Sequence, residues 1–148
     1  MIVVIFKDIG VRLKMKYPVA IKQQIGEKQI TIYVPDLPGC QEIAESIDVA
    51  MIRINEAIIS HLTILAEYGE SIPTPKSIDH HIEQSHDRSI IWAIIDLDIT
   101  PYLGRSHKIN VTLPELLIKQ IDDRVSKQPD YKTRSGFIAK ACLDELTK

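Results

Sequence analysis

A short segment near the C-terminus places polar side chains where they could recognise nucleic-acid bases. Lys108, Asn110 and Thr112 occupy alternate positions, and an extended chain puts alternate residues on the same face. The opposite face of this segment is apolar and consists of Ile109, Val111 and Leu113. The pattern therefore predicts a strand with one face in a core and the other face available to contact bases.

A helix is expected directly after this strand. Pro114 suits the first turn of a helix, because the N–H that proline lacks would find no partner there, and Glu115 favours the positive end of the helix. Leu117, Ile121 and Val125 then repeat at helical spacing as far as about residue 128. The strand is thus predicted to lead into a helix without a loop.

A second helix and a partner chain follow from the remaining C-terminal residues. Pro129 and Asp130 interrupt the first helix, and Thr133 is a good N-cap for the next one. The apolar positions of this second helix are Phe137, Ile138, Ala141, Cys142 and Leu146. One short strand cannot satisfy its edge hydrogen bonds alone, so we expect it to pair with a second copy in a homodimer or a higher even oligomer. The predicted dimer core comprises Ile109, Val111, Leu113, Leu117, Ile121, Phe137 and Ile138.

Residues 107–148 resemble the ribbon-helix-helix DNA-binding family, in which two such strands form an antiparallel ribbon in the major groove. The resemblance implies that Lys108, Asn110 and Thr112 read bases, since lysine suits guanine and asparagine suits adenine. It also implies a phosphate site at the start of the second helix, where free N–H groups face an anion. The residues of that site are Thr133, Arg134 and Ser135. The simpler alternative is an ordinary half-buried hairpin strand.

The N-terminal part of the chain predicts strands followed by a long helix. Alternation covers residues 17–23 and 29–34, joined by a turn into a hairpin, and residues 41–44 form a third short strand. Ser46 caps a helix that reaches about Tyr68, and Gly69 is placed to end it. After a polar stretch at 79–88, residues 90–97 are apolar on both faces, as in a buried central strand. The fold class is therefore α+β.

The order of these N-terminal pieces resembles the HicB antitoxin family. Tyr17–Ile21 is similar to the opening strand of that family, Pro35–Cys40 to its most recognisable motif, and Ile72–Pro75 to the proline pair after its long helix. The resemblance implies a reduced ribonuclease-H-like, sheet-plus-helix domain over residues 16–99, a linker over 100–107 and a ribbon-helix-helix domain over 108–148. Residues 1–15 form an N-terminal extension, which is interpreted either as the product of an upstream translation start or as an added strand, and residues 2–6 suit both interpretations.

The function that the resemblance implies is an antitoxin that neutralises a HicA-type ribonuclease toxin and represses its own operon by binding operator DNA. The toxin would be blocked because its RNA-binding face and catalytic histidine are covered, so the chain itself needs no catalytic residue and is not an enzyme. Residues 106–148 carry eight basic and six acidic side chains, whereas the rest of the chain carries a net charge of −4. This asymmetry suits DNA for the C-terminal part and a basic protein for the N-terminal part.

Composition predicts a cytoplasmic protein without a cofactor. No apolar run is judged long enough for a membrane span, and the N-terminus lacks the basic start of a signal peptide. Cys40 and Cys142 fall in different expected domains and lack metal-ligand spacing, so both are expected to be reduced thiols. We therefore expect no structural zinc and no membrane partner.

A nuclease is one alternative function, because a ribonuclease-H-like fold invites a search for metal-binding carboxylates. The candidates are Asp36 in a turn and Asp96 and Asp98 on one face of a strand. Two-metal chemistry needs several carboxylates that converge on the ions. The sequence does not bring these three together, so we favour solvent-facing strand ends.

A metal- or ligand-responsive ribbon-helix-helix repressor without a toxin partner is the other alternative. His80, His81 and His86 gather in one polar segment, and imidazoles are common ligands of nickel, copper and zinc. No cysteine accompanies them, and a polar segment with three histidines is more often a solvated loop. The sequence contains no glycine-rich phosphate loop, CxxC motif or Ser–His–Asp ordering that would support another enzyme class.

Overall fold

The computed structural model describes residues 11–148, which form two compact units. One unit spans residues 14–103, and the other contains residues 104–148 together with residues 11–13. The suggested added strand at residues 2–6 lies outside the described residues. Lys14 and Met15, which we expected in an N-terminal extension, belong to the first strand of the sheet.

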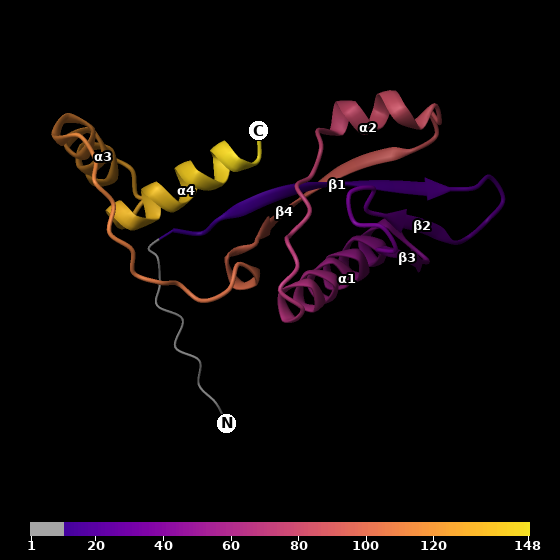
Figure 1. Cartoon of the computed structure of the whole chain (residues 1–148). Helices are drawn as coiled ribbons and strands as arrows, with labels where there is room; N and C mark the ends of the chain where they lie inside the picture. The colour runs from indigo at the N-terminus through magenta and orange to yellow at the C-terminus, as the bar shows by residue number, and fades with distance from the viewer. Residues whose placement is uncertain (1–10) are drawn as a thin grey trace. The chain divides into compact units, whose positions relative to one another are not determined.

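A four-stranded antiparallel sheet forms the centre of the first unit (Figure 1). Its strands are β1 (Lys14–Gln23), β2 (Ile30–Tyr33), β3 (Gln41–Ala44) and β4 (Ile91–Asp98), in the order β3-β2-β1-β4. Ile21 of β1 lies opposite both Ile32 of β2 and Ile91 of β4, and opposed residues share a face. The expected hairpin and the third strand at 41–44 are confirmed.

The long helix α1 (Ile47–Glu67) packs against the apolar face of the sheet, mainly on β2 and β3. Ser46 caps it, because the hydroxyl oxygen of Ser46 accepts a hydrogen bond of 3.2 Å from the backbone N–H of Val49. Gly69 follows the helix in the left-handed conformation, at a φ of 68°. The predicted cap, helix and C-terminal stop are confirmed. The helix residues that face the sheet are Ala50, Ile54, Ile58 and Leu62, each 0% exposed.

The prediction that residues 90–97 form a central strand is wrong. β4 lies at an edge of the sheet, and the side chains of Ile91 and Ile94 are exposed. Trp92 lies opposite Ala20 of β1, so it points to the face away from Val19 and its partner Ala93. Apolar residues on both faces of β4 therefore do not require a neighbouring strand on each edge.

The polar stretch at 79–88 contains a helix where we expected a loop. This helix, α2 (Ile78–Ser85), is capped by the hydroxyl oxygen of Ser77, which accepts a hydrogen bond of 3.2 Å from the backbone N–H of His80. It lies on the opposite side of the sheet from α1 (Figure 1). No residue of α2 is buried, so hydrophobic packing alone does not hold it on the sheet.

The second unit contains two helices and an extended stretch. A 3-10 turn η1 (Thr100–Tyr102) ends the first unit, and residues 104–114 form neither helix nor strand. α3 (Glu115–Lys127) and α4 (Arg134–Leu146) confirm the two predicted helices, and Thr133 is the N-cap of α4. Pro114 stands just before α3 and not in its first turn. The strand predicted at 108–113 is absent from this single chain.

α1 satisfies, by length and composition, the requirements of a membrane-crossing helix, which corrects the prediction that no apolar run is long enough. The helix nevertheless packs on the sheet along one side. Only 22% of its most apolar 18-residue stretch is buried in the chain. α1 therefore carries exposed apolar side chains, such as Ile52 and Ile64, as well as buried ones.

Candidate functional site

The predicted base-reading residues lie in the extended stretch of the second unit. Lys108, Asn110 and Thr112 are all exposed. The apolar residues between them are accessible too, since Ile109 is 75% and Val111 57% exposed. Polar and apolar side chains thus alternate along the segment. Both kinds are accessible, as expected for an extended segment that has no neighbouring strand.

Three of the four predicted dimer-core residues of the two helices line one surface hollow. Leu117 and Ile121 of α3 and Phe137 of α4 line a pocket of about 610 Å³. Ile121 is buried and Leu117 is exposed, whereas Leu113, Phe137 and Ile138 are half-buried. The single chain therefore covers Ile121 but leaves Leu117 exposed and the other three side chains only partly covered.

The start of α4, where the phosphate site is implied, holds an ion pair that the sequence did not predict. The hydroxyl oxygen of Thr133 accepts a hydrogen bond of 3.0 Å from the backbone N–H of Gly136, as an N-cap does. The guanidinium of Arg134 donates two hydrogen bonds to the carboxylate of Asp122 in α3, at 2.9 and 2.7 Å. These hydrogen bonds lower the pKa of Asp122 and raise that of Arg134. A phosphate at this site would compete with Asp122 for Arg134, while Ser135 beside it is exposed.

The first unit brings Asp36, which we considered for nuclease chemistry, close to His81, which we considered for metal binding. Nε2 of His81 lies 2.8 Å from a carboxylate oxygen of Asp36, and the two side chains are only 11% and 6% exposed. The ring of His81 also stacks on Trp92 of β4, with the ring centroids 5.9 Å apart and the planes at 14°. His81 therefore fastens α2 both to the Pro35–Cys40 turn and to the sheet.

The Pro35–Cys40 motif is accounted for by the turn that it builds. The backbone N–H of Cys40 donates to the carbonyl of Leu37 at 3.0 Å, and the Leu37 side chain is 0% exposed. Gly39 has a φ of 84°, a conformation that favours glycine. Burial, followed by a nearby carboxylate, raises the pKa of the Cys40 thiol. The turn presents Asp36 to His81 and keeps Cys40 in its neutral form.

The proline pair after α1 is tied to the sheet through Tyr17. The phenol of Tyr17 donates a hydrogen bond of 2.8 Å to the carbonyl of Pro73. Burial, together with the negative charge of Asp36, raises the pKa of Tyr17 to about 12. Tyr17 therefore stays protonated at neutral pH and continues to act as this donor.

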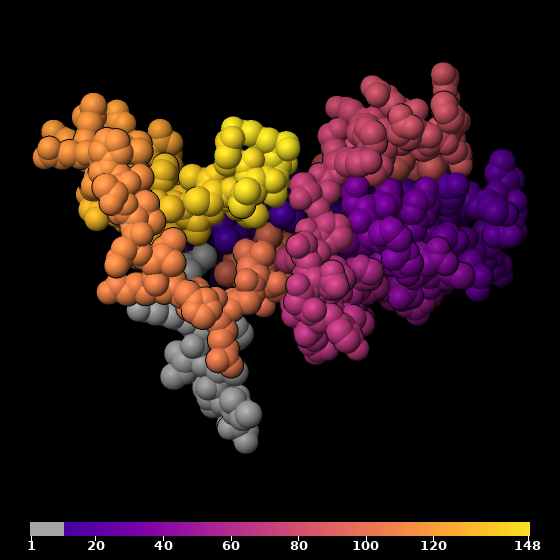
Figure 2. Space-filling view, viewed as in Figure 1, coloured from indigo at the N-terminus to yellow at the C-terminus, as the bar shows by residue number. Residues whose placement is uncertain are grey.

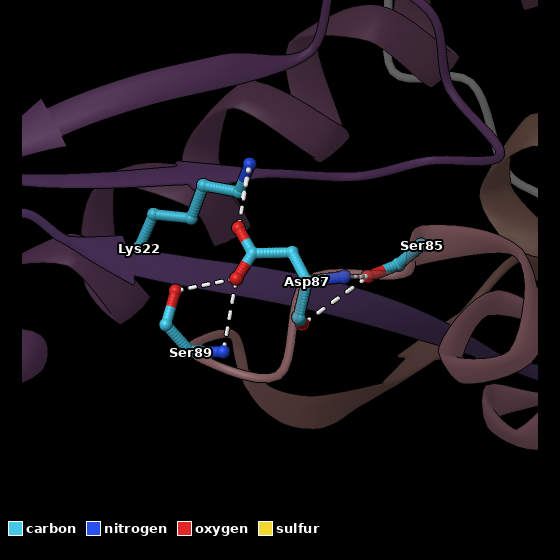
Figure 3. Close-up of polar contacts among 4 residues, drawn as sticks. All are labelled: Lys22, Ser85, Asp87 and Ser89. Atoms are coloured by element: carbon cyan, nitrogen blue, oxygen red, sulfur yellow. Dashed lines mark hydrogen bonds and ion pairs between the residues drawn. The ribbon is translucent and has the colours of Figure 1, made fainter.

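The C-terminal end of α2 is held by a small polar network (Figure 3). The carboxylate of Asp87 accepts hydrogen bonds from the backbone N–H and the hydroxyl of Ser89, at 2.9 and 2.6 Å. Its other oxygen lies 3.3 Å from Nζ of Lys22 in β1. Ser85 accepts a hydrogen bond of 3.1 Å from the N–H of Asp87. The hydrogen bonds from Ser89 lower the pKa of Asp87, and the network joins α2 to the sheet through Lys22.

The carboxylates considered for nuclease chemistry each have a partner of their own. Asp96 lies 3.7 Å from Nζ of Lys14, and Asp98 accepts a hydrogen bond of 3.0 Å from the N–H of Thr100. Within residues 11–148, no group of three or more histidine, cysteine or acidic side chains is arranged to hold a metal ion. Asp36, Asp96 and Asp98 do not converge.

The three histidines considered for metal binding lie in different environments. His80 contacts the ring of His81 edge-on, with centroids 5.5 Å apart, and His81 faces Asp36. His86 follows α2 in the left-handed conformation, at a φ of 53°. Cys40 and Cys142 are free thiols, the first buried and the second exposed.

Sequence reasoning missed α2 and the long-range polar pairs, among them His81–Asp36 and Arg134–Asp122. A signal for the helix was present, because Ser77 is a capping residue and Asp79 suits the first turn. The pairs His81–Asp36 and Arg134–Asp122 join residues that are 45 and 12 positions apart. One sequence carries no periodic pattern that identifies contacts at such separations.

The sheet, with a long helix on one face and a short one on the other, and the helical second unit define an α+β protein of two units. Residues 17–142 match the model of a family described as the HicB-like antitoxin of bacterial toxin–antitoxin systems. The chain therefore belongs to the HicB-like antitoxin family.

Individual relatives agree with this assignment. The crystal structure of the Burkholderia pseudomallei antitoxin HicB is 31% identical, with a TM-score of 0.68 over 89% of this chain and 98% of that one. The antitoxin HicB3 shares the fold at 23% identity, with a TM-score of 0.67 over 90% of this chain and 99% of its own. An uncharacterized 14.9 kDa protein from the rep-hol intergenic region of Haemophilus phage HP1 (strain HP1c1) is 33% identical over 132 residues, which cover 89% of this chain and 98% of that protein.

Proposed function

We propose that this antitoxin neutralises a HicA-type ribonuclease toxin and represses its own operon as a dimer bound to operator DNA. The observation that carries the DNA-binding part is the exposed alternating segment 108–113, followed by two helices whose apolar side is uncovered. In the proposed dimer, the segments of two chains pair as an antiparallel ribbon. Their apolar faces then cover Leu117 and Phe137 of both chains.

The polar face of the ribbon is the proposed base-reading surface. Lys108, Asn110 and Thr112 lie side by side on it and enter the major groove, where base edges are distinguishable. The start of α4 binds a phosphate through Thr133, Arg134 and Ser135. Arg134 exchanges Asp122 for the phosphate, so it contributes to affinity without selecting a sequence.

The toxin-neutralising part is proposed to be the first unit, residues 14–103. Family membership supports a toxin partner, and the charge of the unit suits a basic one, since it carries thirteen acidic and seven basic side chains. Neutralisation then works by coverage of the toxin surface. The antitoxin contributes no catalytic group, which fits the separate partners found for Asp36, Asp96 and Asp98.

Co-expression tests both parts together. The chain is expressed with the product of the neighbouring reading frame, the complex is purified, and the partner is separated and assayed for RNA cleavage. We expect a small basic partner that cleaves RNA only after this chain is removed. A chain that purifies alone while still binding its own promoter would contradict the antitoxin role and leave a stand-alone repressor.

The phosphate contact has a separate test. Arg134→Ala should weaken DNA binding on all sequences and reduce the slope of log affinity against log salt by about 1, because each phosphate contact releases counterions. Lys148→Ala, at an exposed lysine paired with Glu145, is the matched control. An unchanged salt slope for Arg134→Ala would assign this arginine to the α3–α4 ion pair alone.

A further inference from the structure

α1 carries more apolar surface than its packing on the sheet requires. On a helical projection, Asp48, Ile52, Glu56, Ile59 and Thr63 fall on the side opposite to the buried residues Ala50, Ile54, Ile58 and Leu62. We call this set the outer face of α1. All five residues of the outer face are exposed, with Ile52 at 61% and Ile59 at 37%.

The outer face combines an apolar strip, formed by Ile52 and Ile59, with the acidic side chains of Asp48 and Glu56. Protein interfaces have a similar composition, with an apolar core and a charged rim. The hydroxyl of Thr63 donates a hydrogen bond of 2.7 Å to the carbonyl of Ile59, so its methyl group adds to the apolar strip of the two isoleucines. Figure 2 shows atoms of α1, in purple to magenta, on the visible surface of the first unit. Apolar strips of this kind, flanked by charge, mark sites of association.

The charged side chains around the strip are acidic. α1 contains Asp48, Glu56 and Glu67, and its only arginine or lysine is Arg53. That arginine is already engaged, because it donates a hydrogen bond of 2.6 Å to the carbonyl of Ile43 and lies 3.7 Å from Glu45. The outer face therefore presents apolar contacts within a negative potential, which attracts a basic partner and repels a second acidic copy of this unit.

We propose that the outer face of α1 is the surface on which the toxin docks, with Ile52 and Ile59 as its apolar anchors and Glu56 as a charged contact. This inference rests on the proposed toxin-neutralising function. The inference assigns neutralisation to one surface of the first unit. It also explains why α1, whose inner side is already buried on the sheet, has exposed isoleucines on its outer side.

Affinity for the purified co-encoded basic protein tests the proposal on the full chain. Ile52→Lys and Ile59→Lys should each weaken binding by at least roughly 30-fold, because each adds a positive charge at an anchor that faces a basic partner. Ile25→Lys, at a fully exposed isoleucine in the β1–β2 turn, is the control and should bind as the unaltered chain does. Lysine is a good helix former, so α1 is preserved, and the thermal midpoint measured by circular dichroism checks this.

A second variant and the oligomeric state complete the test. Glu56→Lys leaves the apolar strip intact and should slow association most strongly at low salt. Affinities of Ile52→Lys and Ile59→Lys equal to that of Ile25→Lys would overturn the proposal, as would a change in oligomeric mass without a change in toxin affinity, which would assign the face to a copy of this chain. Failure of the unaltered chain to bind the co-encoded protein would instead overturn the proposed function itself.

Discussion

The two units differ in how much of their apolar surface one chain can bury. In residues 14–103, side chains from the sheet and from α1, such as Tyr17, Ile32, Ile54 and Ile58, are 0% exposed. In the second unit, Ile121 is the only buried large hydrophobic side chain of residues 104–148, and Val11 and Leu13 are buried as well. Leu116 and Leu146, by contrast, are 67% and 82% exposed. The first unit therefore has a complete hydrophobic core in one chain, whereas α3 and α4 of the second unit leave much of their apolar surface exposed.

This difference between the units should make their functions depend differently on protein concentration. A unit with its own core keeps its fold at any concentration, so the proposed toxin-binding surface should be available on every chain. A unit that needs a second copy is stabilised by mass action, and its order depends on protein concentration. DNA binding should therefore vary with antitoxin concentration more steeply than toxin binding does.

The largest expected effect comes from a charge placed on the exposed apolar side of α3. Leu117→Asp should abolish dimer formation and DNA binding, because the dimer would bury an unpaired carboxylate at a cost of several kcal/mol. Leu117 is 42% exposed in one chain, so the first unit should be unaffected. Sedimentation velocity and a DNA-binding assay measure the two losses. A Leu117→Asp protein that still dimerises and binds operator would refute the assignment of α3 to the dimer core.

A truncation in the complete core should behave differently. Ile58→Ala removes a fully buried side chain between α1 and the sheet and should lower the free energy of unfolding of the first unit by about 2–5 kcal/mol. Because no second copy is involved, this loss should be the same at every protein concentration. Ile52→Ala on the exposed side of α1 is the control, and chemical denaturation measures both. A concentration-dependent loss for Ile58→Ala would erase the contrast between the units.

The attachment of α2 gives a smaller, local effect. His81→Ala leaves the Asp36 carboxylate without its partner and should weaken the docking of α2 by about 1.5–3 kcal/mol, as for a hydrogen bond to a charged group. Trp92 is the only tryptophan in the chain, so its emission maximum and its quenching by acrylamide report this docking directly. His80→Ala is the matched control. Equal quenching in the His81→Ala and unaltered proteins would show that the ring stack does not hold α2.

The smallest of these effects concerns one base contact. Asn110→Ala should cost about 1–3 kcal/mol at the cognate operator and nothing in toxin affinity. Fluorescence anisotropy with operator and with scrambled DNA separates the specific loss from a general one. Equal losses on DNA and toxin would show that the two units do not work separately.

The sequence predicted best the features that local patterns determine. The hairpin of β1 and β2, the caps at Ser46 and Thr133 and the helical stripes of α1, α3 and α4 all follow from periodicity and capping. The edge position of β4 did not, because a strand that is apolar on both faces looks alike whether helices or strands surround it.

The polar contacts were harder to predict than the elements. Asp36 and His81 were each considered for a different chemistry, and only the folded turn places them 2.8 Å apart. Likewise, nothing in the local sequence around Arg134 indicates Asp122 as its partner. Such pairs depend on tertiary placement, and for these residues placement decides the role.

In the proposed dimer, a second copy completes residues 104–148, whereas residues 14–103 are complete in one chain. Amide hydrogen exchange of the full chain, followed residue by residue across a dilution series, tests it most directly. We expect amides of α3, α4 and residues 108–113 to lose protection on dilution, while those of β1 and α1 keep theirs. Equal protection of both units at every concentration, with a monomeric mass throughout, would contradict it.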